Sequence, residues 1–212
     1  MDRELLAATL AEAGEPSYRA GQVWEWVARG AASYEEMTNL PGALRERLEQ
    51  AVPLSTLSVE AEARSDDGTV KTLFHTADGR PLEAVLMRYR DDRRSVCVSS
   101  QSGCPLTCTF CATGQMKFGR NLTAAEILDQ VLHFRRIEPV DHLVFMGMGE
   151  PGFNMPNVLD SARRLPTSAA PIAAPRCPRS AGCRGSRSSP PPTCRSGSRS
   201  RCTRPTLTCA RS

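Results

Sequence analysis

The sequence is organised around one short stretch, Cys104-Pro105-Leu106-Thr107-Cys108-Thr109-Phe110-Cys111, which holds three cysteines in eight residues. A tight loop with this spacing can direct three thiolates to one point. A structural zinc site usually takes four protein ligands, but no fourth Cys lies nearby, and the closest His, His133, falls in an expected helix. Three thiolates suit a [4Fe-4S] cluster that leaves one iron open. Buried structural cysteine is the plainer alternative.

Three further segments extend the pattern around these cysteines. They are Cys97-Val98-Ser99-Ser100-Gln101-Ser102-Gly103-Cys104, Phe110-Cys111-Ala112-Thr113-Gly114 and Gly147-Met148-Gly149-Glu150-Pro151. Together with the cysteine spacing, they resemble the RlmN-like family of radical S-adenosylmethionine (SAM) enzymes. The resemblance runs from about Tyr18 to about Leu165 and then stops.

The resemblance implies two cofactors and the residues that hold them. The [4Fe-4S] cluster is expected on Cys104, Cys108 and Cys111, and SAM is expected on its open iron. Gly149 and Glu150 follow an expected strand, where backbone groups and a carboxylate can hold the SAM amino group. The implied activity is a SAM-dependent RNA methyltransferase that forms 2-methyladenine in 23S rRNA and tRNA, supplied by an electron donor that reduces the cluster.

The family reaction also implies roles for a carboxylate and a second thiol. In the family, a first SAM methylates a C-terminal cysteine, and the resulting methyl-cysteine intermediate adds its carbon to adenine C2. Glu83 matches the proton acceptor and Cys97 matches the cysteine that resolves the thioether. From the residues alone, Glu83 is either a water-exposed residue of an edge strand or a partly buried base. The methyl-carrying cysteine is expected beyond residue 212.

Charge is distributed unevenly along the 212 residues. Nine Arg and no acidic residue follow Pro166, so residues 1–165 carry 18 basic and 23 acidic side chains, a net charge of −5. The formal charge of +4 therefore comes from the C-terminal segment and is no indication of RNA binding.

The N-terminal sequence has no signal-peptide pattern, and no apolar run is long enough to cross a membrane. The nine Cys then indicate a reducing, cytoplasmic compartment rather than disulfides. The expected protein is a cytoplasmic monomer that does not contact a membrane.

Periodicity predicts an α/β protein. Helices are expected over 2–13 and 19–29 and after Pro41, with a capping box at Ser33; they form a small N-terminal helical domain over 1–52 in which both Trp side chains belong to the core. Strands at 69–75 and 81–87 flank the turn residues Asp78-Gly79. They form a β-hairpin connector over 53–94.

The order of strands and helices after residue 94 is that of a barrel. Strands over 95–99 and 142–146 enclose a helix that starts at a Thr123 capping box, and another helix is expected over 156–165. This strand–helix–strand order predicts the first units of an incomplete radical SAM (β/α) barrel over 95–165, with chemistry at the strands' C-terminal ends.

Residues 166–212 have no such periodicity and are rich in Pro, Arg, Ser and Ala, which predicts a disordered, low-complexity tail. Five of the nine Cys lie there, which fits poorly with a solvated cytosolic tail. The reading frame can be shifted by joining the third base of each codon to the first two bases of the next. From Arg176 onward, permitted codon choices in this shifted frame encode Val-Ser-Thr-Val-Gly-Trp-Leu-Pro-Gly-Ile and, further on, Leu-Ala-Val-Ser-Leu-His-Ala-Pro-Asp. These strings resemble the family's next barrel strands, and they favour a frameshift near codon 165.

Two other functions remain open from the sequence. Gly152 stands where a larger apolar residue is expected, so a related radical SAM specificity such as adenine C8 methylation is one alternative. A non-enzymatic iron–sulfur or zinc-binding module is the other. Metal analysis separates the second alternative from both enzymes, since zinc without sulfide would exclude the cluster.

Overall fold

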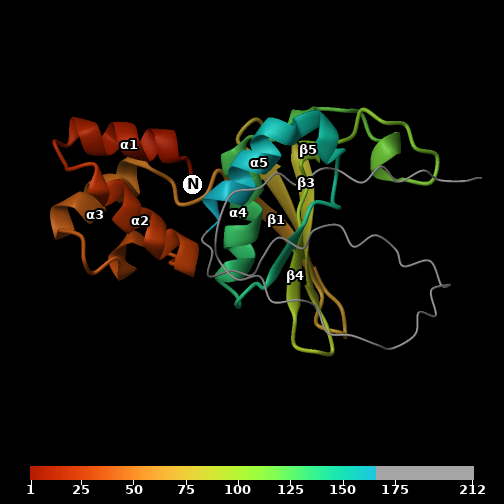
Figure 1. The fold of residues 1–212 in the computed structure, drawn as a ribbon, viewed down its shortest axis with the longest axis horizontal. Helices are drawn as coiled ribbons and strands as arrows, with labels where there is room; N and C mark the ends of the chain where they lie inside the picture. Colours follow the sequence, from red (N-terminus) through yellow and green to blue (C-terminus); the bar gives the residue numbers. More distant parts are fainter. Residues whose placement is uncertain (166–212) are drawn as a thin grey trace, which may run out of the picture. The chain divides into compact units, whose positions relative to one another are not determined.

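The computed structural model describes residues 1–165, which form a helical part followed by a part built on one β-sheet (Figure 1). The N-terminal helices and the mixed α/β part that follow them confirm the expected fold class. The predicted disordered tail, 166–212, lies outside the described residues.

The helices of the helical part begin and end at residues that favour helix caps. α1 (Arg3–Glu12) starts at Asp2, whose carboxylate accepts hydrogen bonds from the Glu4 and Leu5 amides. α2 (Tyr18–Arg29) ends at Gly30, which adopts a left-handed φ of 100°. Ser33 forms the predicted capping box, which starts the short helix η1 (Tyr34–Glu36), and α3 (Gly42–Ala51) follows Pro41.

The core of the helical part is formed by apolar side chains from every one of its helices and from the sheet part. Its largest fully buried members are Leu6, Met37 and Leu48, and Leu132 of the later helix α4 joins them. Both Trp24 and Trp26 pack against this core, as predicted, and the Trp26 indole donates a hydrogen bond of 2.7 Å to the Asn39 side chain. The helical part therefore has its own hydrophobic core and also packs on the sheet part.

The sheet has five strands in the order β1-β2-β3-β4-β7. The predicted hairpin is β2 (Val70–Thr76) and β3 (Pro81–Arg88), with Gly79 of its turn at a left-handed φ of 73°. β3 pairs antiparallel with β4 (Arg94–Cys97), so the hairpin connector and the barrel strands share one sheet. β1 (Leu57–Arg64), which was not among the predicted strands, pairs with β2 and exposes all but its first residue.

One unit of the barrel is complete in the described residues. β4 continues through the cysteine loop into α4 (Ala124–Arg135), which starts at the predicted Thr123 capping box and returns the chain to β7 (His142–Val144). β7 pairs parallel with β4, as a βαβ crossover requires. The short helix η3 (Pro151–Asn154) and α5 (Met155–Arg164) follow. Within residues 1–165, no helix is long and apolar enough to cross a membrane.

One face of the sheet carries its hydrophobic core. Alternate residues of β3, Leu82, Ala84 and Leu86, are fully buried and face the same cluster as Ile127 and Phe134 of α4. The intervening residues of β3 are half-buried and lie on the opposite face. The sheet thus has a covered face under the helices and a second face that carries Glu83.

The strand β4 ends earlier than the predicted strand 95–99 because the backbone of Ser99 pairs with a side chain instead of a strand. The Gln130 amide, fully buried in α4, accepts from the Ser99 N–H at 2.8 Å and donates to the Ser99 C=O at 3.0 Å. An amide side chain carries a donor and an acceptor side by side, so it can pair with both the N–H and the C=O of one residue. The Gln130–Ser99 pair therefore fixes the point at which the chain leaves the sheet toward the cysteines.

We expect Gln130→Leu to destabilise the chain by about 2–4 kcal/mol, because a buried N–H and a buried C=O of Ser99 would both lose their partners. Urea unfolding followed by circular dichroism measures this loss. The matched control is Gln50→Leu, because Gln50 is exposed on α3 and its replacement should change the free energy of unfolding by less than about 0.5 kcal/mol. Equal effects of the two substitutions would contradict the structural role of Gln130.

Candidate functional site

The cysteine loop, residues 103–119, extends from a two-stranded ribbon. Its strands are β5 (Gln101–Ser102) and β6 (Arg120–Asn121), paired antiparallel with Gln101 opposite Asn121 and Ser102 opposite Arg120. The Gln101 side chain also donates a hydrogen bond of 2.7 Å to the Asn121 side chain. The two ends of the loop are therefore held together at its base.

The loop packs backbone against backbone, which explains its glycines. Gly103 has a left-handed φ of 73°, and a Cβ there would lie 2.5 Å from the Lys117 carbonyl oxygen. A Cβ on Gly114 would lie 3.0 Å from the Cys108 amide nitrogen. Successive turns join the thiol-bearing residues, since the Cys111 N–H donates to the Cys108 C=O and the Gly114 N–H donates to the Cys111 C=O. The loop is a folded element, although it has little regular secondary structure.

Cys104, Cys108 and Cys111 are free and half-buried on this loop. Hydrogen bonds from the backbone N–H groups of Gly114 and Thr113 hold the pKa of the Cys111 thiol below its usual value, which favours the thiolate. In the part of the chain that the structure describes, no three His, Cys, Asp or Glu side chains lie close enough to share a metal ion. The three thiols are thus brought to one loop without converging on one point.

The donor set on this loop nevertheless fits an iron–sulfur cluster. Thiolates are soft ligands that select iron–sulfur centres, copper(I) or zinc, and a cluster has several iron atoms for thiols that are spread along one loop. Phe110, beside Cys111, is 91% exposed, so the outer side of the loop is open to a large group.

The second candidate binding element is the loop 147–151, which follows β7. Its backbone is bound to the segment after β4: the Gly147 N–H donates to the Val98 C=O, and the Met148 N–H donates to the Ser99 hydroxyl at 2.8 Å. Gly149 has a left-handed φ of 93°, and a Cβ on it would lie 2.5 Å from the Gln101 side chain. The predicted glycine is therefore required by both backbone conformation and close packing.

Gln101 connects the two candidate binding elements. Its side-chain oxygen accepts a hydrogen bond of 2.9 Å from the Glu150 N–H, while its nitrogen donates to Asn121 at the base of the cysteine loop. The Glu150 carboxylate is half-buried and accepts from the Gly152 N–H at 3.1 Å. One side chain thus fixes the position of the Gly149–Glu150 backbone relative to the cysteine loop.

Buried Asn154 provides a second connection. Its side-chain nitrogen donates to the Ser100 C=O at 2.7 Å and to the Leu122 C=O at 2.8 Å, on either side of the cysteine loop. Sequence reasoning missed Gln101, Asn154 and Gln130 as contributors to the site. The only signal for Gln101 was its place inside the quoted motif, and nothing in the sequence distinguished Asn154 or Gln130 from surface residues.

Glu83 and Cys97 share the second face of the sheet. Val85 lies directly opposite Cys97 in the β3–β4 register, so Glu83, two residues along β3, is a diagonal neighbour of Cys97 on that face. Glu83 is half-exposed and forms a 2.7 Å ion pair with Lys71. β3 is paired on both sides, so Glu83 does not lie on an edge strand, although its side chain is exposed to water as that interpretation expected. Burial raises the pKa of the Cys97 thiol, so Cys97 stays protonated at neutral pH.

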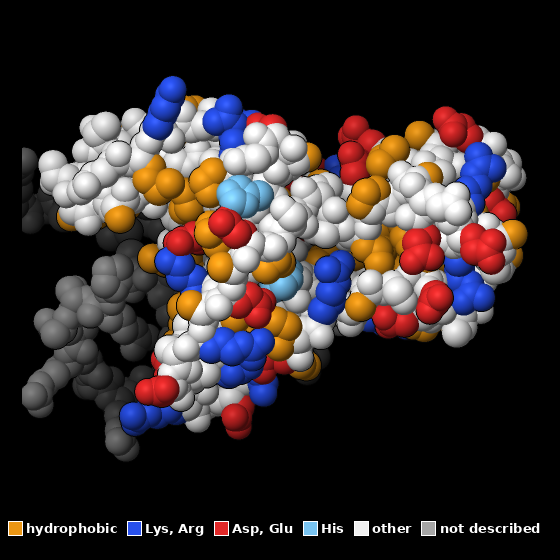
Figure 2. All heavy atoms as spheres, turned by 180° about the vertical axis from the view of Figure 1, so that it is seen from behind, with side chains coloured by type: hydrophobic (Ala, Val, Ile, Leu, Met, Phe, Trp, Pro, Cys, Tyr) orange, Lys and Arg blue, Asp and Glu red, His pale blue; other side chains and the backbone are white. Residues whose placement is uncertain are grey.

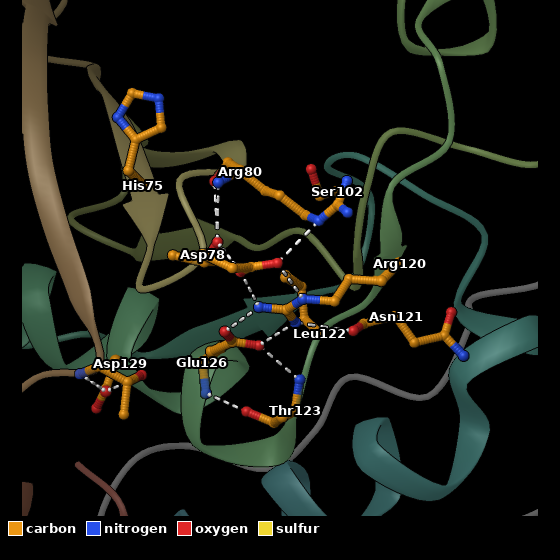
Figure 3. Close-up of polar contacts among 12 residues, drawn as sticks. His75, Asp78, Arg80, Ser102, Arg120, Asn121, Leu122, Thr123, Glu126 and Asp129 are labelled. Carbon is orange, nitrogen blue, oxygen red and sulfur yellow. Dashed lines mark hydrogen bonds and ion pairs between the residues drawn. The ribbon is translucent and has the colours of Figure 1, made fainter.

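An ion network holds the exit of the cysteine loop (Figure 3). The Arg120 guanidinium contacts Asp78 of the hairpin turn at 2.6 Å and Glu126 of α4 at 2.7 Å. Hydrogen bonds from Arg120 and then Thr76 hold the pKa of Asp78 well below its usual range. Burial alone would raise the pKa of Glu126, but hydrogen bonds from Arg120 and the Thr123 N–H lower it overall. Both carboxylates are therefore ionised at neutral pH and neutralise Arg120.

Comparison with known proteins gives two domain matches. Residues 1–54 match the ribosomal RNA large subunit methyltransferase N-terminal domain, and residues 98–168 match the radical SAM superfamily. A radical SAM methyltransferase from Sphaerobacter thermophilus has a similar solved structure, with a TM-score of 0.69 and 42% sequence identity. That match covers 80% of this chain and 52% of the other.

Similar sequences carry the same family name. A dual-specificity RNA methyltransferase RlmN from Anaeromyxobacter dehalogenans is 48% identical over 162 residues, which are 71% of this chain and 43% of that protein. A probable dual-specificity RNA methyltransferase RlmN from Thermus thermophilus is 49% identical over 152 residues, with 69% and 42% covered. The chain thus spans less than half the length of these relatives. With both domains matched and a radical SAM methyltransferase as structural neighbour, the chain belongs to the RlmN-like family of radical SAM enzymes.

Proposed function

We propose that residues 1–165 are the RNA-binding and radical-generating portion of a SAM-dependent RNA methyltransferase that forms 2-methyladenine in 23S rRNA and tRNA. The observation that carries this proposal is the Gln101 side chain, which holds the Glu150 backbone against the base of the cysteine loop. A cluster on the loop and a SAM molecule held by Gly149 and Glu150 would therefore meet at one place. The enzyme is expected to work in the cytoplasm as a monomer with a separate electron donor.

A [4Fe-4S] cluster held by the three cysteines would supply the electron that cleaves SAM to a 5′-deoxyadenosyl radical. The chain's own groups bind and orient the SAM methionine end. Among residues 1–165, the Glu150 carboxylate accepts a hydrogen bond only from the Gly152 N–H, which leaves lone pairs for the SAM ammonium group. Gly149 lets the Gln101 side chain pack directly against the backbone of this loop, because a Cβ on Gly149 would lie 2.5 Å from it.

The second sheet face then presents the groups for the later steps. Cys97 lies at the C-terminal end of β4, and the neutral thiol must lose its proton before it can attack the thioether. Glu83 would accept the proton from adenine C2, and the Lys71 ammonium forms a 2.7 Å ion pair with its carboxylate in the substrate-free chain. Their placement on one face supports their assignment to one reaction.

The described residues also support the proposal that this 212-residue chain is an inactive, frameshifted form. β7 is the last strand of the sheet in residues 1–165 and pairs on one side only. The match to the radical SAM superfamily ends at residue 168, where the composition changes to Pro, Arg and Ser. Such a segment has few large apolar or β-branched residues with which to build further barrel strands. The gene's nucleotide sequence around codon 165 shows directly whether the barrel continues in another frame.

Anaerobic reconstitution with iron and sulfide should give the chain a broad visible absorbance that depends on Cys104, Cys108 and Cys111. Replacing all three with Ala should remove this absorbance, because thiolate ligands hold the cluster. The matched control replaces the five cysteines beyond residue 165 with Ala and should keep the absorbance. If the control loses the absorbance and the loop variant keeps it, the loop is not the cluster site.

In a frame-restored enzyme, Glu150→Ala should weaken SAM binding by about tenfold or more, because a charge-assisted hydrogen bond is worth about 1.5–3 kcal/mol. Equilibrium dialysis with labelled SAM measures the change, and Glu49→Ala on the exposed surface of α3 is the control. Cys97→Ala should leave SAM cleavage intact but leave RNA covalently attached to protein, visible on a denaturing gel. Normal turnover by the Cys97 variant would exclude its role as the resolving cysteine.

The 212-residue chain itself should form no 2-methyladenine. Within residues 1–165 the sheet ends at β7, which leaves an open edge and an incomplete barrel. In the proposed shifted frame, the five cysteines that follow do not correspond to the methyl-carrying cysteine. The assay incubates reconstituted protein, a reductant and labelled SAM with protein-free 23S RNA, and then analyses the nucleosides. Catalytic formation of 2-methyladenine by this chain alone would contradict the frameshifted form. The frame-restored enzyme is the positive control.

A further inference from the structure

A pocket of about 550 Å³ lies beside the cysteine loop, on the side of the β2–β3 turn. It is lined by residues 78–81 of the turn and 116–119 of the loop, with Ser102 between them. We refer to it as the hairpin pocket. None of the residues assigned above to the cluster or to SAM lines it.

The hairpin pocket lies on the other side of the β5–β6 ribbon from the proposed SAM site. Successive residues of a strand point to opposite faces. The Gln101 side chain accordingly contacts Glu150, whereas the Ser102 hydroxyl donates a hydrogen bond of 2.9 Å to the Pro81 C=O in the pocket wall. A ligand in the pocket would therefore be adjacent to the cluster loop but separate from SAM.

The pocket has an excess of positive charge. Its one carboxylate, Asp78, is already bound by Arg120 and by the Arg80 Nε at 2.9 Å (Figure 3). The Arg80 guanidinium reaches across the pocket wall, since a Cβ on Gly119 would lie 2.8 Å from its Nη1. Lys117 is exposed and has no ion-pair partner within residues 1–165. Arg80 and Lys117 can thus bind an anionic group together. Lys117 can do so without first losing an ion pair.

The same pocket exposes apolar surface. Phe118 is 40% exposed and Met116 is 43% exposed, both next to Lys117 on the loop. Aromatic surface flanked by cations is the combination that binds unpaired nucleotides, because a base stacks on the ring and the phosphate pairs with the cation. A simple carboxylate or phosphate would use only the charged half of this surface.

The charge distribution of the rest of the described chain also supports the hairpin pocket as an RNA-binding site. Residues 1–52 contain nine acidic and five basic side chains, and acidic side chains are widespread over the helical part in Figure 2. A phosphate backbone gains little from such a surface. An RNA that approaches the cluster loop would therefore meet the pocket's cations within residues 1–165, which carry a net charge of −5.

We propose that the hairpin pocket binds an unpaired nucleotide of the RNA substrate, with its base on Phe118 and its phosphate at Lys117 and Arg80. This inference rests on the proposed function for its substrate class. It assigns to the outgoing half of the cysteine loop a role in positioning RNA, while the thiols on the incoming half bind the cluster.

Fluorescence anisotropy of the full chain with a labelled single-stranded RNA 12-mer tests the proposal at about 100 mM salt. Lys117→Glu should weaken binding by about tenfold and reduce the slope of log affinity against log salt by about one. Phe118→Ala should weaken binding by about 5- to 20-fold, whereas Phe118→Tyr, which keeps a stacking ring, should bind as the unmodified chain does. Arg47→Glu, an equal charge change on the exposed surface of α3, is the control.

Two competitors define the ligand. An unlabelled single strand should displace the probe, and a duplex of the same sequence should displace it at least fivefold less well. Displacement by adenosine monophosphate at the same concentration as the single strand would assign the pocket to free nucleotides and overturn the RNA proposal. Equal weakening by Arg47→Glu and Lys117→Glu, unchanged binding in Phe118→Ala, or no RNA binding by the chain would each overturn it as well.

These results are separable from a failure of the proposed function. Unchanged RNA affinity in the pocket variants, together with 2-methyladenine formation by the frame-restored enzyme, would reject the pocket alone. Pocket-dependent RNA binding without any 2-methyladenine from the frame-restored enzyme would instead reject the proposed reaction and retain the RNA-binding pocket.

Discussion

The structure depends on how the chain satisfies its backbone hydrogen bonds after it leaves β4. At Ser99 the sheet no longer supplies partners, yet the segment is buried, so each unpaired amide or carbonyl would cost free energy. Side-chain amides take the place of a neighbouring strand: Gln130 pairs with Ser99, and Asn154 binds the carbonyl of Ser100. This constraint turns the chain out of the sheet and into the cysteine loop at a fixed position.

The same segment determines how the two candidate binding elements are related. Gln101 bonds to the Glu150 backbone on one side and to Asn121 on the other. Arg120 then anchors the loop's exit to both the hairpin turn and α4. The base of the cysteine loop is therefore held by hydrogen bonds and ion pairs to the hairpin turn, to α4 and to the loop that follows β7.

Patterns with a strong local cause were predictable from the sequence. The capping boxes at Ser33 and Thr123, the turn at Gly79 and the cysteine spacing each depend on residues a few positions apart. β1 was missed although its apolar and polar residues alternate from Leu57 to Arg64; this alternation marks no core face, because seven of its eight residues are exposed. Gln130 and Asn154 were missed because their partners lie 31 and 54 residues away in the chain, and a polar side chain in a helix is ordinarily exposed.

We propose that the loop of residues 103–119 holds a [4Fe-4S] cluster with one iron available to SAM. Mössbauer spectroscopy of the ⁵⁷Fe-reconstituted chain, recorded with and without SAM, measures this directly. The account predicts a four-iron cluster in which one iron changes its isomer shift when SAM is added, while the cysteine-bound irons do not. A spectrum that SAM leaves unchanged in a chain shown to bind SAM, or iron that is not in a four-iron cluster, would contradict it.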